Sequence, residues 1–221
     1  MLRSEAITII KRGLGFRTTQ DTAIIAALQE AQRDLELGKT LPNFLLEYDA
    51  AITVTADSAD ITLPTDFIRF HDDYDMYYVN DDDARVFIPR KNYTEAYQAY
   101  VASGAEDDSA VDTETDIYPS VVVMRGKTAG LLIPTPTTSF TMYLTYYKAA
   151  AVLDSDSENA WLANAPNLLV NYAGTIVAGG LRDKDALAEF SRRARMASNA
   201  LMGDVIEDEL AGRSLIMGRN N

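Results

Sequence analysis

Hydrophobic residues recur at helical spacing in the first 40 residues. A short helix is expected from Ser4 to about "GLGF", and a second is expected to begin at "TTQD", where Thr18 and Asp21 have the spacing of a capping box. Gly38 is placed to end that second helix. Its apolar face is marked by Ile24, Leu28, Ala31 and Leu35. The pattern predicts an N-terminal helix hairpin.

After Pro42 the hydrophobic period changes to two, which is typical of strands. Ile52, Val54 and Ala56 alternate with threonine and aspartate, and "MYYV" and "RVFIP" flank the turn "NDDDA". "KNYTEAYQAYVASG" predicts one short helix, and "SFTMYLTYYK" resumes the sheet. Residues 105–116 are too charged to bury and predict an exposed loop. We therefore expect an antiparallel, β-rich insertion.

The last third returns to helical spacing with "WLANAPNLLVNYAGTIVAGG", which follows the capping segment "DSDSEN". Pro166 falls near the first turn, where a missing N–H costs least. A second stripe follows the short connection "RDKD", so the two helices are expected to pack antiparallel. The predicted core of this hairpin is Trp161, Leu168, Leu169, Tyr172, Ile176, Leu187, Phe190 and Leu201.

These elements predict an α+β fold with a helical core, a β-rich insertion and an extended C-terminal tail. The expected boundaries are residues 1–46 and 154–212 for the helical core, 47–153 for the acidic insertion, and 213–221 for the tail. Gly203 interrupts the last stripe, and we expect the final helix to bend or end near it.

Composition narrows the class of protein. The 221 residues include no cysteine, which excludes disulfides, thiolate metal sites and a cysteine nucleophile. No apolar run approaches the roughly 20 residues that a membrane span needs, and no secretion signal is expected. The net charge is −13, and Glu47–Ser120 carries 18 acidic and four basic residues. Tight DNA binding is not expected from so acidic a chain.

Candidate catalytic and metal-binding groups are sparse. His71 is the sole histidine, and it has no partners for a triad, so a surface residue is favoured over a catalyst. The "GLGFR" segment lacks the third glycine of a dinucleotide loop. Asp154, Asp156 and Glu158 alternate as in a calcium loop but lack its glycine and distal glutamate, which favours helix capping. A cation at the acidic loops stays an open alternative, as does an enzyme with buried carboxylates near "HDDYD".

Two segments suggest contacts with other molecules. Arg192, Arg193 and Arg195 in "SRRAR" form either a solvated helix face or a subunit contact, for which the acidic segment is an evident counterpart. Three adjacent apolar residues in the tail gain little by remaining in water and suit a partner's groove. The candidate docking residues are Arg213, Ser214, Leu215, Ile216, Met217, Gly218 and Arg219.

The order of elements, together with Trp161, Pro166, Leu168 and Leu169, a charged turn and Phe190, resembles the phage head-to-tail adaptor family. These connector proteins form a ring beneath the portal of short-tailed phages. The resemblance covers nearly the whole chain in element order and the last third in residue pattern.

The resemblance implies a structural virion protein with no catalytic role, cofactor or metal. It implies a twelve-fold ring whose C-terminal tail binds the portal protein and whose insertion faces the tail nozzle or fibre proteins. DNA would pass through the channel without specific binding, and the protein would be made in the host bacterial cytoplasm and reside in the virion neck. The alternative is a small interaction module or assembly chaperone that forms no ring and stays monomeric beside a portal.

Overall fold

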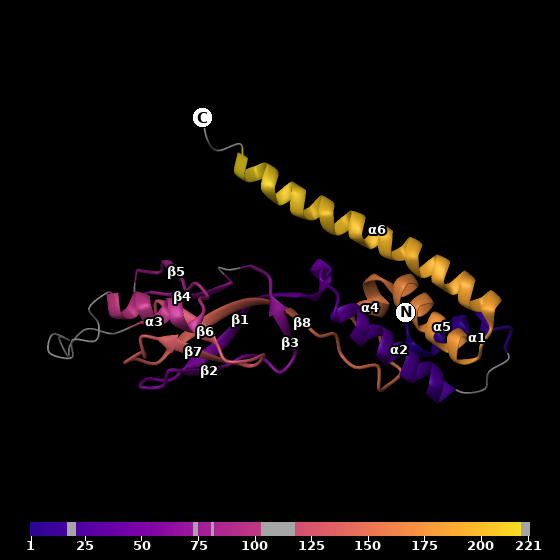
Figure 1. Ribbon diagram of the computed structural model, residues 1–221, viewed down its shortest axis with the longest axis horizontal. Coiled ribbons are helices and arrows are strands. Elements are labelled where there is room, and N and C mark those ends of the chain that lie inside the picture. Colours follow the sequence, from indigo (N-terminus) through magenta and orange to yellow (C-terminus); the bar gives the residue numbers. More distant parts are fainter. Residues whose placement is uncertain (17–20, 73–74, 81, 103–117, 218–221) are drawn as a thin grey trace. The chain divides into compact units, whose positions relative to one another are not determined.

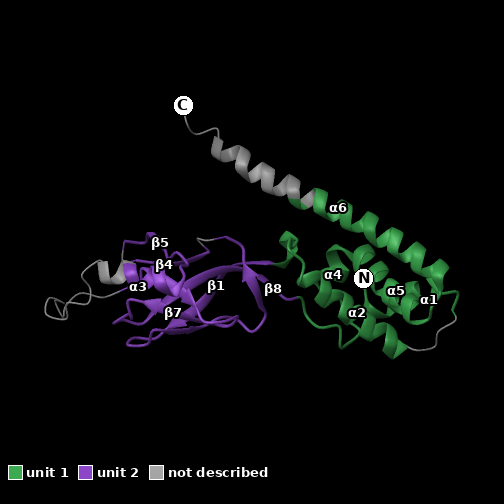
Figure 2. Cartoon of the chain, viewed as in Figure 1, with its two compact units in different colours: residues 1–45, 150–221 green, residues 46–149 purple. Residues whose placement is uncertain are grey.

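The computed structural model describes residues 1–16, 21–72, 75–80, 82–102 and 118–217 (Figure 1). The chain divides into two compact units, which Figure 2 distinguishes by colour. Unit 1 contains residues 1–45 and 150–221, and unit 2 contains residues 46–149. Helices and antiparallel sheets are both present, so the α+β class is confirmed.

Unit 1 is helical, and α5 is its central helix because it packs against α1, α2, α4 and α6. This role agrees with its sequence, which is the most apolar of the chain's long helices and has residues buried on several sides. The elements of unit 1 are α1 (Arg3–Gly13), α2 (Asp21–Glu36), the 3₁₀ helix η1 (Asn43–Leu45), α4 (Ala160–Asn164), α5 (Pro166–Gly180) and α6 (Lys184–Met217).

The stretch from Trp161 to Gly180 forms two helices. Helix α4 begins at the cap Asn159, whose side-chain oxygen accepts a hydrogen bond from the Leu162 amide at 3.0 Å. It ends at Ala165, whose non-helical backbone breaks the run, and α5 restarts with Pro166 in its first turn. A proline interrupts a helix less at its start than in its interior, because no N–H is needed there.

Helix α6 differs from its prediction. It runs without a break from Lys184 to Met217, through Gly203 and through residues 213–217, so an extended tail beginning at residue 213 is wrong for those five positions. One exposed glycine costs a helix only about 1 kcal/mol, and the flanking glutamates, leucines and alanines favour helix. Gly218 and Arg219 lie outside the described residues, as do Thr18 of the expected capping box and the whole of the expected loop at 105–116.

Unit 2 is a two-sheet structure in which every strand pair is antiparallel. Its first sheet has the order β1-β8-β4-β5, with β3 also paired to β8, and its second has the order β2-β7-β6. The strands are β1 (Leu46–Val54), β2 (Asp60–Thr62), β3 (Phe67–Phe70), β4 (Met76–Val79), β5 (Arg85–Phe87), β6 (Val121–Met124), β7 (Ala129–Ile133) and β8 (Phe140–Lys148).

The core of unit 2 lies between these sheets. Alternate residues such as Ile52, Met142 and Leu144 of the first sheet join Val122 and Leu132 of the second in one buried cluster. The other face of the second sheet is covered by α3 (Tyr93–Ala102), whose Ala96 packs against β6. The strands β1 and β8, which begin and end the unit, pair along nearly their whole length.

A buried polar network joins α2 to the segment where the chain returns to unit 1. The Glu36 carboxylate oxygen Oε1 accepts hydrogen bonds from Trp161 Nε1 at 3.1 Å, from Gln32 Nε2 at 3.0 Å and from the Ala150 amide at 3.0 Å. Asn159, which caps α4, donates to Gln32 Oε1 at 3.0 Å. Glu36, Gln32 and Asn159 are all buried, and the network satisfies donors that burial would otherwise leave unpaired.

The aromatic ring of Phe190 on α6 lies against two glycines. A Cβ atom added to Gly174 of α5 would stand 2.5 Å from Phe190 Cδ1, and one added to Gly13 of α1 would also overlap the ring. Phe190 is buried, with 4% of its surface exposed, so the ring has little room to move. The two glycines therefore allow α5 and α1 to approach α6 closely.

We predict that Gly174→Ala lowers the free energy of unfolding by about 1–3 kcal/mol, because the added methyl group overpacks the Phe190 contact. Gly179→Ala in the same helix is the matched control. Its Cβ would meet nothing within 4 Å, so it should raise stability by up to about 1 kcal/mol through helix propensity. Urea unfolding of both variants measures the difference, and equal shifts in the same direction would contradict the close packing.

We predict that Glu36→Ala lowers the free energy of unfolding by about 2–4 kcal/mol, because it leaves three buried donors without an acceptor. Glu36→Gln, which keeps one acceptor oxygen, should cost less. The exposed Glu30 on the same helix is the control, and Glu30→Ala should change stability by no more than about 0.5 kcal/mol. Similar costs for Glu36→Ala and Glu30→Ala in denaturant melts would rule out a structural role for the network.

Candidate functional site

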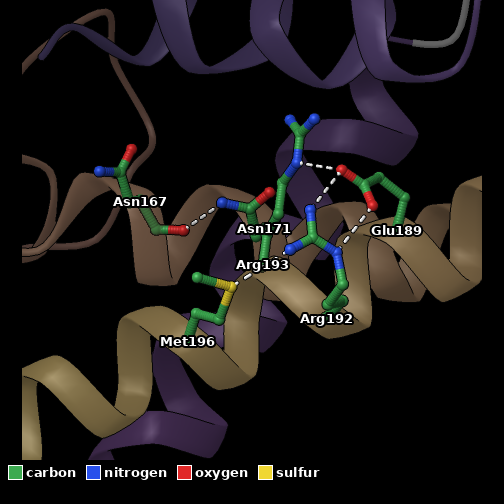
Figure 3. Close-up of polar contacts among 6 residues, drawn as sticks. All are labelled: Asn167, Asn171, Glu189, Arg192, Arg193 and Met196. Atoms are coloured by element: carbon green, nitrogen blue, oxygen red, sulfur yellow. Dashed lines mark hydrogen bonds and ion pairs between the residues drawn. The ribbon is translucent and has the colours of Figure 1, made fainter.

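The sequence-predicted arginines lie on the part of α6 that packs along α5. Arg192 and Arg193 converge on Glu189, as Figure 3 shows. Arg192 binds that carboxylate with two nitrogens, Nε at 3.0 Å and Nη2 at 2.9 Å, and Arg193 Nε lies 2.6 Å from Glu189 Oε1. The third arginine, Arg195, is exposed. Spacings of three and four residues bring Glu189 onto the same helix face as its two partners.

This shared contact changes the acidity of Glu189. Hydrogen bonds from Arg192 and then from Arg193 lower the pKa of its carboxyl group to about 2. Glu189 therefore stays charged over the whole physiological range. Its negative charge offsets the positive charge of one of the three arginines, so the face of α6 that carries these four residues keeps a net positive charge.

Arg192 and Arg193 border a groove of about 450 Å³ between α6, α5 and α1. Its walls include Ile9, Asn171, Arg193 and Met196, so they combine apolar, amide and cationic groups. Met196 is 60% exposed and lies 3.2 Å from Arg192 Nη1 through its sulfur atom. An open groove of this composition suits contact with another protein surface.

The residues predicted for the helix-hairpin core differ in burial. Trp161, Leu168, Leu169 and Phe190 are buried, whereas Tyr172, Ile176, Leu187 and Leu201 are partly exposed. Tyr172 donates a hydrogen bond to Asp34 of α2 at 3.3 Å. Burial, together with Asp34 and Glu30, raises the pKa of Tyr172.

The end of α6 is formed by the candidate docking residues Arg213, Ser214, Leu215, Ile216 and Met217.

Acidic residues of the segment before α4 contact the first residues of the chain. Asp156 accepts a hydrogen bond from the Ser4 amide in the first turn of α1 at 2.8 Å, and Glu158 pairs with the Met1 amino group. The first contact gives a hydrogen-bond acceptor to an N–H group that has no partner within the helix, and the second pairs the positive charge of the amino group with a carboxylate. Among the described residues, no three His, Asp or Glu side chains are grouped so that they could hold a metal ion.

His71 lies beside Asp75, with 3.8 Å between His71 Nδ1 and Asp75 Oδ1. Asp75 is buried, and this burial raises the pKa of its carboxyl group. The Asp72 amide donates a hydrogen bond to the Asp75 carboxylate, which acts in the opposite direction. The His71 ring also lies against the Tyr147 ring, with 5.7 Å between the ring centroids.

No helix of the described structure is both long and apolar enough to cross a membrane.

Fold and surface together define a two-unit α+β protein whose helical unit presents a charged helix face and an open groove. The chain belongs to the SU10 adaptor protein family, whose family model matches residues 2–219. This match confirms the resemblance to phage head-to-tail adaptors, which are structural proteins of the virion. None of the curated proteins compared with the chain matches it.

We predict that Glu189 titrates with a pKa of about 2, and that Arg192→Gln moves this value upward, toward the ordinary value for glutamate. The reason is that Arg192 makes the largest contribution to the shift. Carboxyl-detected NMR titration measures both values. Arg195→Gln is the control, because that residue lies outside the shared contact, and an ordinary Glu189 pKa in the unmutated chain would contradict the geometry.

Proposed function

We propose that this chain is a head-to-tail adaptor that forms a ring under the phage portal, attaches tail components and continues the DNA channel. The observation that carries the proposal is the family match, which extends over residues 2–219. The protein would reside in the virion neck, with portal protein on one side and tail nozzle or fibre proteins on the other. A twelve-fold ring is the expected assembly.

The proposed subunit contact uses the arginine face of α6, made by Arg192, Arg193 and Arg195. A closed ring joins one surface of each subunit to a different surface of its neighbour. Opposite charges on the two surfaces favour the correct pairing and suppress the wrong one. The net positive charge that remains beyond Glu189 supports a contact with an acidic surface.

The C-terminal end of α6 is the proposed portal-docking segment, made by residues Arg213–Arg219. Helix α6 has 34 residues and α5 has 15. At a rise of about 1.5 Å per residue, α6 is about 50 Å long and α5 only about 22 Å. Helix α6 therefore extends well beyond the length of α5, and the apolar residues Leu215, Ile216 and Met217 near its end suit a partner's groove.

The negative charge of the chain fits a DNA conduit. With a net charge of −13, the subunit repels the phosphate backbone over much of its surface. A genome that must slide through a channel is better served by weak repulsion than by cationic contacts that would hold it. DNA would accordingly pass through the ring without specific binding.

We predict that the purified chain co-elutes with portal rings of the same phage at a fixed number of copies per portal, and that removing residues 213–221 abolishes this binding. Light scattering after size-exclusion chromatography measures the mass of each complex. Removal of Asn220 and Asn221 alone is the control and should leave binding intact. A chain that ignores the portal would favour the interaction module or assembly chaperone instead.

A further inference from the structure

The exposed side of α6 carries a regular stripe of residues. Starting at Ala188, exposed residues recur at steps of four, three, four and three. They are Ala188, Arg192, Arg195, Asn199 and Met202. This spacing places them on one line along the helix, turned away from Phe190 and Ala194, which are buried within unit 1. We call this line the α6 stripe.

Helix α2 carries a second stripe, on the side opposite its buried residues Ile24, Leu28 and Ala31. Its exposed members recur at steps of three, four, three and four: Ala23, Ala26, Glu30, Arg33 and Leu37. We call this line the α2 stripe. Leu37, just after the last turn, is 74% exposed and adds an apolar side chain to the stripe.

The two stripes are complementary in charge. Around the α6 stripe, Arg192, Arg193 and Arg195 outnumber Glu189, and beside the α2 stripe Glu30 and exposed Asp34 outnumber Arg33. Each stripe also has an exposed apolar end, Met202 on α6 and Leu37 on α2. A steps-of-three-and-four pattern on both helices is the spacing that lets two helices pack side by side.

The stripes also face in different directions. Helix α5 packs against both α2 and α6, and Figure 1 shows α5 between them. Each stripe lies on the side of its helix that is turned away from that helix's buried residues, and the two approach each other only at one end, where Asp34 and Met202 line the same pocket. Two unlike surfaces on one body produce head-to-tail contacts, which close into a ring when the rotation per subunit allows it.

We propose that the α6 stripe of one subunit packs against the α2 stripe of the next subunit, with Arg192 and Arg195 facing Glu30 and Asp34. This inference rests on the proposed ring function and names its contact. The occupant of each stripe is therefore a second copy of this chain. It places the acidic counterpart of the arginine face on the neighbour's helical unit and not on its β-rich insertion.

The absence of cysteine makes this contact directly testable, because any introduced cysteine pair is the only one present. Asn199→Cys on the α6 stripe is mixed with Ala23→Cys, Ala26→Cys or Glu30→Cys on the α2 stripe, and each mixture is assembled on portal rings and oxidised mildly. A disulfide forms only where the Cα atoms come within about 7 Å, so the scan of three positions covers about two turns of register.

A head-to-tail contact makes a sharp prediction for this experiment. Each single variant alone should give no covalent dimer, at least one mixture should give covalent dimers, and the chain carrying both cysteines of that pair should give a ladder of higher species. Ala163→Cys, at an exposed alanine of α4, is the matched control and should give no dimer with Asn199→Cys. Asp82→Cys on the insertion should also give none.

Three results would overturn the proposal in different ways. Dimers from Asn199→Cys alone would mean a symmetric contact, and dimers with Asp82→Cys would make the insertion the counterpart. Full assembly on the portal with no dimer in any α2 mixture would remove the contact and leave the adaptor function standing. Failure of the unmutated chain to assemble on the portal would instead overturn the proposed function, and the contact with it.

Discussion

The helical unit depends on one buried carboxylate, that of Glu36 at the end of α2. The chain leaves this unit after Leu45 and returns at Ala150, more than a hundred residues later. Glu36 accepts a hydrogen bond from the Ala150 amide at the point of return and another from Trp161 in α4. The helices that follow are therefore positioned on α2 by a polar contact and not only by hydrophobic packing. Directional hydrogen bonds suit this task, because hydrophobic burial alone does not specify one arrangement.

The contact between Phe190 and its two glycines provides the second constraint. It holds α6 close to α5 and α1, while the Glu36 network holds α2 and α4. The two exposed stripes on α2 and α6 are thereby fixed relative to each other within one packed unit. A ring requires this, since the angle between the two contact surfaces of a subunit sets whether, and at what copy number, the ring closes. In the proposed ring, close packing at Phe190 would therefore serve assembly as well as stability.

The sequence predicts much of this fold, and its errors have physical causes. Helical spacing locates α2 and α5, because Ile24, Leu28 and Leu168 each mark a buried face that one period describes. The continuation of α6 past Gly203 was mispredicted, because a single exposed glycine imposes a local cost that good helix-forming neighbours outweigh. The capping role expected of "DSDSEN" is confirmed at its last residue, Asn159, which caps α4, and Asp156 of the same segment accepts a hydrogen bond in the first turn of α1.

The candidate site was predictable to a different degree. The binding of Arg192 and Arg193 by Glu189 follows from their spacing alone and could have been read from the sequence. The Glu36 network could not, because Gln32 and Asn159 lie 127 positions apart and nothing in the local pattern relates them. The sequence locates the buried face of α2 at Ile24 and Leu28, but it does not show that the other face, which carries the α2 stripe, stays exposed in the folded unit.

The distribution of charge between the two units bears on how like-charged subunits could assemble at all. Unit 2 contains 18 acidic and seven basic residues, a net charge of −11, whereas unit 1 contains 15 acidic and 13 basic residues, a net charge of −2. Charges separated by more than about 8 Å are largely screened at physiological ionic strength. In the proposed ring, subunits that meet through their nearly neutral helical units would avoid most of this repulsion. The partition leaves most of the negative charge of the chain on the β-rich insertion and outside the proposed contact between helical units.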